Sequence, residues 1–207
     1  MKRTILFFTI LTLSSCSSVL LKMYGLKNPK HLDNLSISKI AYKYDIPEKN
    51  LFVLDSSYFS FLFSLDSIKY KKQIKNHSQP LQALYFDKSE NFISFYINCY
   101  AGGFPNLKWN RNGILNSFVP KTQTPLDSVI TFRQHLKYIK TLNNKSVSSD
   151  SLNSDYYVIV YWNRFMGRQS KRLIKYINRN LKLSDKSVQT SYVNTDNAYF
   201  DHAMKVK

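Results

Sequence analysis

Cysteine, glycine and histidine are scarce in this sequence, and each shortage excludes a class of protein. The 207 residues include two Cys, five Gly and four His. Two cysteines form at most one disulfide, so a small fold held together by several disulfides is excluded. Five glycines leave little room for a glycine-rich phosphate-binding loop. The histidines show no metal-ligand spacing, so we predict neither a metal site nor a cofactor.

Apolar and basic residues, in contrast, are abundant. Apolar residues make up 43% of the sequence and aromatic residues 15%. A chain of this composition can bury a core that offsets the entropy lost on ordering, so a disordered protein is excluded. The length fits one folded domain. The 30 Lys and Arg residues outnumber 13 acidic residues, which gives a formal net charge of +17.

The N-terminus has the layout of a signal peptide. Lys2 and Arg3 precede an apolar run at 5–13, and the sequence Leu-Ser-Ser-Cys follows at 13–16. The run is too short to cross a bilayer core of about 30 Å, which takes about 20 residues as a helix. Leu-Ser-Ser-Cys resembles the lipobox, the cleavage motif of bacterial lipoproteins. The resemblance implies that residues 1–15 are removed and that Cys16 carries a lipid anchor that holds the mature chain to a membrane.

The residue after this cysteine bears on which membrane that is. Many bacterial lipoproteins carry an Asp at this position as a signal for retention in the inner membrane, and here the residue is Ser17. The resemblance therefore favours the outer membrane. The alternative interpretation is an ordinary secretory signal with an incidental cysteine.

Cleavage and export change the meaning of the positive charge. Removing residues 1–15 takes away Lys2 and Arg3 and no acidic residue, which lowers the net charge from +17 to +15. In a cytosolic protein this excess would suggest nucleic acid, which we exclude as a partner here. In the cell envelope the available anions are lipid head groups and acidic glycans, and envelope proteins are further candidate partners. A basic surface that is merely solvated remains the alternative.

Hydrophobic periodicity divides residues 32–207, which follow a tether at 16–31, into helices and strands of one domain. We expect helices at 35–44, 58–74, 126–142 and 168–181, and strands at 51–54, 81–86, 92–98, 107–109, 114–118, 156–162 and 188–194. Asn112 and Gly113 predict a hairpin between the strands at 107–109 and 114–118, because both residues tolerate positive φ. Thr124 as N-cap with Pro125 and Asp127 behind it predicts the start of the third helix.

The strand at 156–162 carries the most information about the fold. Its sequence, Tyr-Tyr-Val-Ile-Val-Tyr-Trp, has no polar alternation, so both of its faces should be covered. A helix and another strand follow it and form a βαβ unit, whereas the strands before it are arranged as an antiparallel meander. This combination predicts an α/β fold with a mixed sheet flanked by helices.

The sequence that leaves this strand resembles the active-site strand and loop of thioredoxin-like proteins. In that family the strand runs into Phe-Trp-Ala-x-Trp-Cys-Gly-Pro-Cys, and the second half of the motif begins a helix. Tyr161 and Trp162 match the Phe-Trp pair, Phe165 stands for the second Trp, and Gly167 matches the Gly. The sequence at 192–197 is similar to the family's next strand. The resemblance covers residues 156–197 and implies a thioredoxin-like domain.

The departures from the family pattern concern its chemistry. Met166 and Gln169 stand at the positions of the two cysteines, and Arg168 replaces the Pro. Dithiol exchange needs a reactive thiolate and a second thiol, so the resemblance implies a redox-inactive domain. The family's closing parts resemble the Gly-Gly-Phe-Pro loop at 102–105, the hairpin at 107–118 and the helix at 126–142. That order would be circularly permuted; the alternative is a meander that extends the sheet.

Basic residues crowd the loop and helix that follow the strand at 156–162. Arg168 and Arg172 oppose the helix dipole at its N-terminal end, and a bound anion would explain them. The alternative is that they extend into solvent. The candidate binding residues are Trp162, Arg164, Met166, Gly167, Arg168, Gln169 and Arg172.

Cys99 is a weaker candidate for chemistry. It precedes Gly102 and Gly103, whose backbone N–H groups could receive an oxyanion, so Cys99 could be the nucleophile of a thiol-dependent peroxidase or acyl-transfer enzyme. The alternative is a buried, inert thiol at a strand end. We therefore expect a redox-inactive binding or interaction module of the cell envelope, with the Cys99 enzyme or a purely structural subunit as alternatives.

Overall fold

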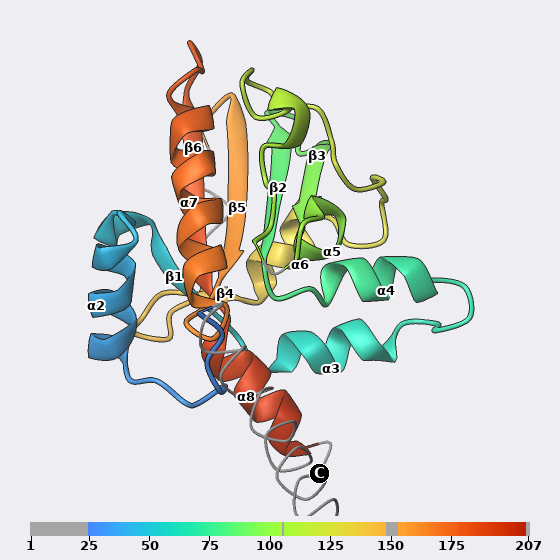
Figure 1. Cartoon of the computed structure of the whole chain (residues 1–207). Coiled ribbons are helices and arrows are strands. Elements are labelled where there is room, and N and C mark those ends of the chain that lie inside the picture. The colour runs from blue at the N-terminus through green and yellow to red at the C-terminus, as the bar shows by residue number, and fades with distance from the viewer. Residues whose placement is uncertain (1–24, 105, 148–152, 206–207) are drawn as a thin grey trace, which may run out of the picture.

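The computed structural model (Figure 1) describes residues 25–104, 106–147 and 153–205. Its helices are α2 (Asn34–Lys43), α3 (Ser57–Ser64), α4 (Lys71–His77), α5 (Asn98–Ala101), α6 (Phe132–Lys137), α7 (Gly167–Leu181) and α8 (Asp196–Lys205), with the 3₁₀ turns η1 (Glu48–Asn50) and η2 (Arg111–Gly113). Its strands are β1 (Leu51–Leu54), β2 (Gln82–Asp87), β3 (Phe92–Ile97), β4 (Ile139–Lys140), β5 (Tyr156–Trp162) and β6 (Val188–Asn194). The segment predicted to be a signal peptide and Cys16 lie outside the described residues. No described helix is long and apolar enough to cross a membrane.

The strands form one six-stranded mixed sheet in the order β3-β2-β5-β6-β1-β4. β5 lies near the centre, parallel to β6 on one side and antiparallel to β2 on the other. β1 continues the parallel part beyond β6, and β4 closes that edge in the antiparallel direction. The predicted mixed sheet flanked by helices is therefore confirmed.

Alternate residues of the strands point into two separate cores, one on each face of the sheet. From β5, Val158 and Val160 join the core covered by α2 and α7, and this core also includes buried residues of the loop at 107–118. Tyr157 and Ile159 join the opposite core, which α3, α4, α6 and α8 cover. Figure 1 shows α7 lying along one face of β5 and β6. The prediction that both faces of this strand are covered is confirmed.

The expected helix at 58–74 is wrong, because the chain breaks into α3 and α4. The backbone N–H groups of Ile68 and Lys69 donate to Oδ1 of Asp66 at 2.9 and 3.0 Å. An aspartate that binds the backbone two and three residues ahead stabilises a turn in place of a helix. The apolar periodicity continues across this turn, and for that reason it predicted a single helix.

The hairpin expected at 107–118 is also wrong. Asn112 and Gly113 do adopt positive φ, 57° and 72°, but within η2 and without flanking strands. Side chains bind the backbone of this loop in place of a strand ladder: Oδ1 of Asn110 accepts from Leu115 N at 2.8 Å. Nδ2 of Asn180, on α7, donates to the carbonyl oxygens of Leu115 and Ser117.

The helix expected at 126–142 shrinks to α6, which begins at a different cap. Thr131 is the N-cap, and it forms a capping box with Gln134. Asp127, expected as the acidic residue in the first turn behind the Thr124 cap, instead accepts hydrogen bonds from Val129 N and from the ring of His77. The start predicted at Thr124 is therefore wrong, because a tertiary contact uses the aspartate.

Candidate functional site

The candidate site lies at the carboxyl ends of the parallel strands β5 and β6, where α7 begins. Ligands of open α/β sheets commonly bind at this edge. Residues 163–166 form the β5–α7 loop, and residues 25–32, which we call the strap, lie across it. The site therefore combines three segments that are distant in sequence: the strap, the β5–α7 loop, and the turn from β6 into α8.

Asn163 holds the β5–α7 loop in its conformation. Its Oδ1 accepts from Met166 N at 2.8 Å, and its Nδ2 donates to the carbonyl oxygen of Pro80 at 2.8 Å. Its own carbonyl oxygen accepts from the Ser170 hydroxyl at 2.6 Å. Asn163 is fully buried, and these bonds fix the loop to the turn before β2 and to the first turns of α7.

Asp196 joins the two strand ends from the side of β6. Its Oδ2 accepts from Arg164 N at 2.6 Å and from Nδ2 of Asn194 at 2.9 Å. The side chain is buried, and this burial raises the pKa of Asp196 above its ordinary value although Arg164 and Asn194 act in the opposite direction. Its Oδ1 has no hydrogen-bond partner among the described residues. Leaving one oxygen of a buried carboxylate without a hydrogen bond is energetically unfavourable. The bonds to the other oxygen hold the loop after β5 against the end of β6.

The strap is bound to this site at several points. Lys27 N donates to the carbonyl oxygen of Phe165 at 2.8 Å, and Nη2 of Arg164 donates to that of Asn28 at 2.5 Å. At the other end, Asn197 binds both backbone groups of Leu32, at 2.8 and 2.9 Å. Part of the segment that the sequence assigned to the tether, residues 25–28, is therefore in contact with the domain.

The predicted binding residues separate into buried and accessible groups. Trp162, Gly167 and Gln169 are buried. Oε1 of Gln169 accepts from Leu107 N at 3.1 Å, so this side chain holds the loop at 107–118 against α7. The remaining predicted residues, Arg164, Met166, Arg168 and Arg172, are half-buried or exposed.

The accessible side of α7 is strongly basic. Its exposed or half-buried cations are Arg168, Lys171, Arg172, Lys175 and Arg179, and we call them the α7 basic face. The first turn of the helix contains no acidic residue. The ion pairs found among the described residues are His77–Asp127 and Arg133–Glu90, so no cation of this face is paired with a described carboxylate. The face is available to an external anion.

Cys99 lies on α5 and is exposed, so the interpretation as a buried thiol is wrong. Its Sγ donates to Oε1 of Gln79 at 2.9 Å, and Nδ2 of the neighbouring Asn98 lies 3.8 Å from the sulfur. The side chains of His135 and His202 have other contacts: His135 binds Tyr161, and the ring of His202 stacks on Phe63. An amide oxygen is no general base, so the thiol has no activating partner among these contacts.

The sequence did not reveal a buried polar cluster in the core beneath α6. Nε2 of His77 lies 3.2 Å from Oδ2 of Asp127, and Nδ1 of His135 lies 2.9 Å from the hydroxyl of Tyr161. The two imidazole rings are 5.4 Å apart, centre to centre. Burial, reinforced by the nearby His77, lowers the pKa of His135 well below its ordinary value. Because these residues are about 50 and 26 positions apart in sequence, no local motif marks them.

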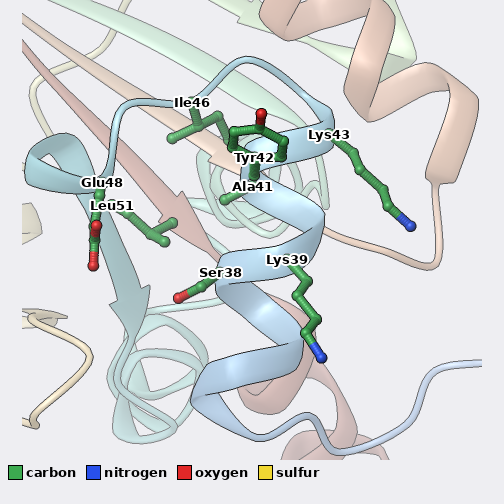
Figure 2. A pocket seen from close by; sticks show the side chains of 8 residues that line it. All are labelled: Ser38, Lys39, Ala41, Tyr42, Lys43, Ile46, Glu48 and Leu51. Atoms are coloured by element: carbon green, nitrogen blue, oxygen red, sulfur yellow. The ribbon is translucent and has the colours of Figure 1, made fainter.

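A separate depression of about 420 Å³ lies between α2 and the segment that leads into β1. Figure 2 shows Ile46 and Leu51 facing α2 across it, while Lys39 and Lys43 extend away from it. It shares no lining residue with the β5–α7 loop or the strap. Its walls are largely apolar, and they bring together no group of catalytic side chains.

Neither metal chemistry nor a known relative helps to define the site. In the part of the chain that the structure describes, no group of three or more His, Cys, Asp or Glu side chains is arranged to hold a metal ion. Comparisons with protein-family models, curated proteins and solved structures find no match to this chain. Its function must therefore be inferred from its own residues.

Proposed function

We propose that this protein is a lipid-anchored lipoprotein of the cell envelope, with the outer membrane favoured, whose redox-inactive thioredoxin-like domain is a binding module. The α7 basic face is its binding surface, and the partner is anionic. The observation that carries the proposal is the row of cations on α7 that lacks described acidic partners. Cations at the N-terminal end of a helix oppose its dipole, so an anion bound there would relieve an unfavourable interaction.

The topology supports the thioredoxin-like assignment. β5, α7 and β6 form a βαβ unit, and the antiparallel hairpin of β2 and β3 joins it at β5. The resemblance expects a hairpin after such a unit, whereas β2 and β3 precede it in the chain. This order is the one that a circular permutation would produce, with the hairpin at 82–97 in place of the expected 107–118.

The residues at the positions of the family's cysteines support a redox-inactive domain. Met166 N and the buried Gln169 are both engaged in hydrogen bonds that fix loops, and neither side chain can form a disulfide. The Gln169 side chain therefore has a structural role at the position of the second cysteine, and Met166 supplies no thiol at the first.

The anchor is tested by replacing Cys16. In the full chain, Cys16→Ala should move the protein from the membrane fraction to the soluble fraction after cell lysis. Cys99→Ser is the matched control, because it removes the other thiol and should leave the protein in the membrane fraction. Retention of the Cys16→Ala protein in the membrane fraction would overturn the anchor assignment.

The binding face is tested by charge reversal on a soluble polyanion. The mature Cys16→Ala chain is applied to immobilised dextran sulfate and eluted with salt. The double variant Arg168→Glu/Arg172→Glu should elute at clearly lower salt, because electrostatic binding depends on the cations that touch the polymer. The double variant Lys72→Glu/Lys75→Glu on α4 makes the same change in net charge at exposed positions. Equal shifts in the two variants would show that net charge alone acts, which would overturn the proposal.

The alternative of a thiol-dependent enzyme remains tied to Cys99. Because this thiol is exposed, alkylation of the folded protein is expected under either function and does not discriminate between them. A comparison that does discriminate is peroxide consumption and thioester hydrolysis by the mature protein and its Cys99→Ser variant. The binding module predicts equal rates for both proteins, whereas a loss of turnover in the variant would support the enzyme.

A further inference from the structure

We propose that the strap holds the N-terminal end of the α7 basic face against the anionic phospholipid headgroups of the membrane that receives the Cys16 lipid. This inference rests on the proposed function, and it names the partner. It follows from where the strap begins, which charges surround that point, and how few residues separate it from the anchor.

The strap begins in contact with the first turn of α7. A Cβ atom on Gly25 would lie 3.1 Å from Cβ of Arg168, and the carbonyl oxygen of Gly25 packs against Gly167. The bonds from Lys27 and Arg164 continue this contact along the β5–α7 loop. The first described residue of the chain therefore lies at the N-terminal end of α7.

Only residues 16–24 connect this point with the lipid anchor. A chain of that length spans at most about 30 Å, since an extended residue covers about 3.5 Å. The start of α7 therefore stays within about 30 Å of the membrane surface whatever path those residues take. If the strap were undocked as far as Leu32, the reach would be nearly twice as long and the orientation of the domain would be much less restricted.

The charged residues of the strap and of the first two turns of α7 are all basic, whereas the carboxylate of Asp196 is buried beneath them. Lys27 and Lys30 of the strap are exposed, and they add to Arg168, Lys171 and Arg172 at the start of α7. A Lys or Arg close to an anionic membrane surface contributes about 1 kcal/mol of attraction, which is weak for a single residue. The short connection to the anchor keeps the local headgroup concentration high, so these weak contacts add to an existing attachment.

A second basic segment offers a direct comparison. Lys69, Lys71, Lys72 and Lys75 lie around the start of α4 and along it, beside Ile68, which is 94% exposed. This segment belongs to the opposite face of the sheet, and Figure 1 shows it apart from α7. It has no contact with the strap among the hydrogen bonds described above. Membrane contact through α4 is therefore a distinct outcome that an experiment can recognise.

The first experiment measures binding of the mature Cys16→Ala chain to vesicles. Vesicles that contain phosphatidylglycerol should bind the protein, and pure phosphatidylcholine vesicles should not. Arg168→Glu/Arg172→Glu should weaken binding by at least about tenfold, and the matched Lys72→Glu/Lys75→Glu change should have a much smaller effect. No binding to the anionic vesicles, equal losses, or a larger loss in the α4 variant would overturn the proposal.

The second experiment measures orientation in the lipidated protein. In a Cys99→Ser background, Lys175→Cys on α7 and Lys72→Cys on α4 each provide one thiol for a fluorophore and each remove one positive charge. A quencher attached to lipid headgroups should quench the α7 label more strongly than the α4 label. Equal quenching, or stronger quenching at α4, would contradict the proposed orientation.

The outcomes also separate this inference from the proposed function. If dextran sulfate binding depends on α7 but anionic vesicles are not bound, the binding module stands and its partner is another envelope anion, a glycan or a protein. If dextran sulfate binding does not depend on α7, the proposed function itself fails. Vesicle binding that depends on α7, together with stronger quenching of the α7 label, supports both.

Discussion

The carbonyl oxygen of Gly25 lies where a side chain of residue 167 would begin. A Cβ atom on Gly167 would stand 2.3 Å from that oxygen, well inside van der Waals contact. The strap can pack on the start of α7 because this position has no side chain. Two backbone segments that are far apart in sequence therefore approach each other closely at one glycine.

This contact predicts that Gly167→Ala displaces the strap. The new Cβ would force the two segments apart, and φ of +33° at this position adds backbone strain. Trypsin should then cleave more rapidly after Lys27 and Lys30, which are exposed in the strap. Limited proteolysis followed by mass spectrometry measures the rate at these two sites.

Gly102 supplies the matched control. Its φ is +63°, so alanine is strained there as well, but the new Cβ would meet only Nη1 of Arg111 at 3.7 Å. Gly102→Ala should leave the cleavage rate after Lys27 and Lys30 close to that of the unmodified protein. Equal acceleration in both variants would mean that general destabilisation, and not the lost contact, exposes the strap.

Asp196, which joins the two strand ends beneath the strap, should tolerate replacement by Asn better than replacement by Ala. Asp196→Ala removes the acceptor of Arg164 N and of Asn194 and should lower the free energy of unfolding by about 2–3 kcal/mol. Asp196→Asn keeps an oxygen acceptor for Arg164 N and Asn194, although its amide N–H groups would replace an oxygen that has no described partner. It should therefore cost clearly less than Asp196→Ala. Urea denaturation measures both, and equal losses would contradict this account.

A similar pair of variants tests the contact between His77 and Asp127. Both side chains are at most 9% exposed, and the ring of His77 holds the pKa of the carboxyl below its ordinary value although burial acts to raise it. Asp127→Ala leaves the buried ring without this acceptor and should lower the free energy of unfolding by about 2–3 kcal/mol. Asp127→Asn keeps an oxygen acceptor and should cost clearly less. The thermal unfolding midpoint compares the two, and a more destabilising Asn variant would argue against the contact.

Sequence periodicity predicted correctly those elements in which the pattern of apolar residues matches the pattern of burial within the element itself. β5 has seven residues without polar alternation, and α7 repeats its apolar residues on one face, so each pattern determined one structure. Strand β1, which the sequence placed at 51–54, is found with the same bounds. In these segments the local preference and the tertiary environment agree.

The failures occur where a side chain has two possible uses. Asp127 has the position and chemistry of a capping residue, but it binds His77, 50 residues earlier in the chain. Asn112 and Gly113 adopt the conformations that a hairpin needs, but Asn180 binds the adjoining backbone from α7. In both cases a residue that is distant in sequence determines the local structure, and the local sequence alone does not indicate that residue.

The candidate site was predictable only in part for the same reason. The basic residues of α7 are visible in the sequence because they are close together and lie on one helix. The closing strap was not predictable, because its bonds to Phe165 and Asn197 come from backbone groups that every residue has. These backbone contacts of the strap, and not the charged residues, determine how the segments of the site are arranged.

The burial of His135 predicts how stability changes with pH. An unfolded histidine has a pKa of about 6.5, whereas burial beside His77 lowers the pKa of folded His135 well below that value. Between these two values the unfolded state binds a proton that the folded state does not bind, so the free energy of unfolding falls as pH decreases below about 6.5. The slope contributed by this residue is at most about 1.4 kcal/mol per pH unit.

The measurement of this effect needs a background in which the Tyr161 hydroxyl has no role, because that hydroxyl bonds to Nδ1 of His135 at 2.9 Å. Urea denaturation between pH 7.5 and about pH 5 is therefore compared for Tyr161→Phe and Tyr161→Phe/His135→Phe. As pH falls, the free energy of unfolding should decrease more steeply in the single variant, by up to about 1.4 kcal/mol per pH unit. Parallel pH profiles would show that His135 becomes protonated in the folded protein at no extra cost, contrary to its burial.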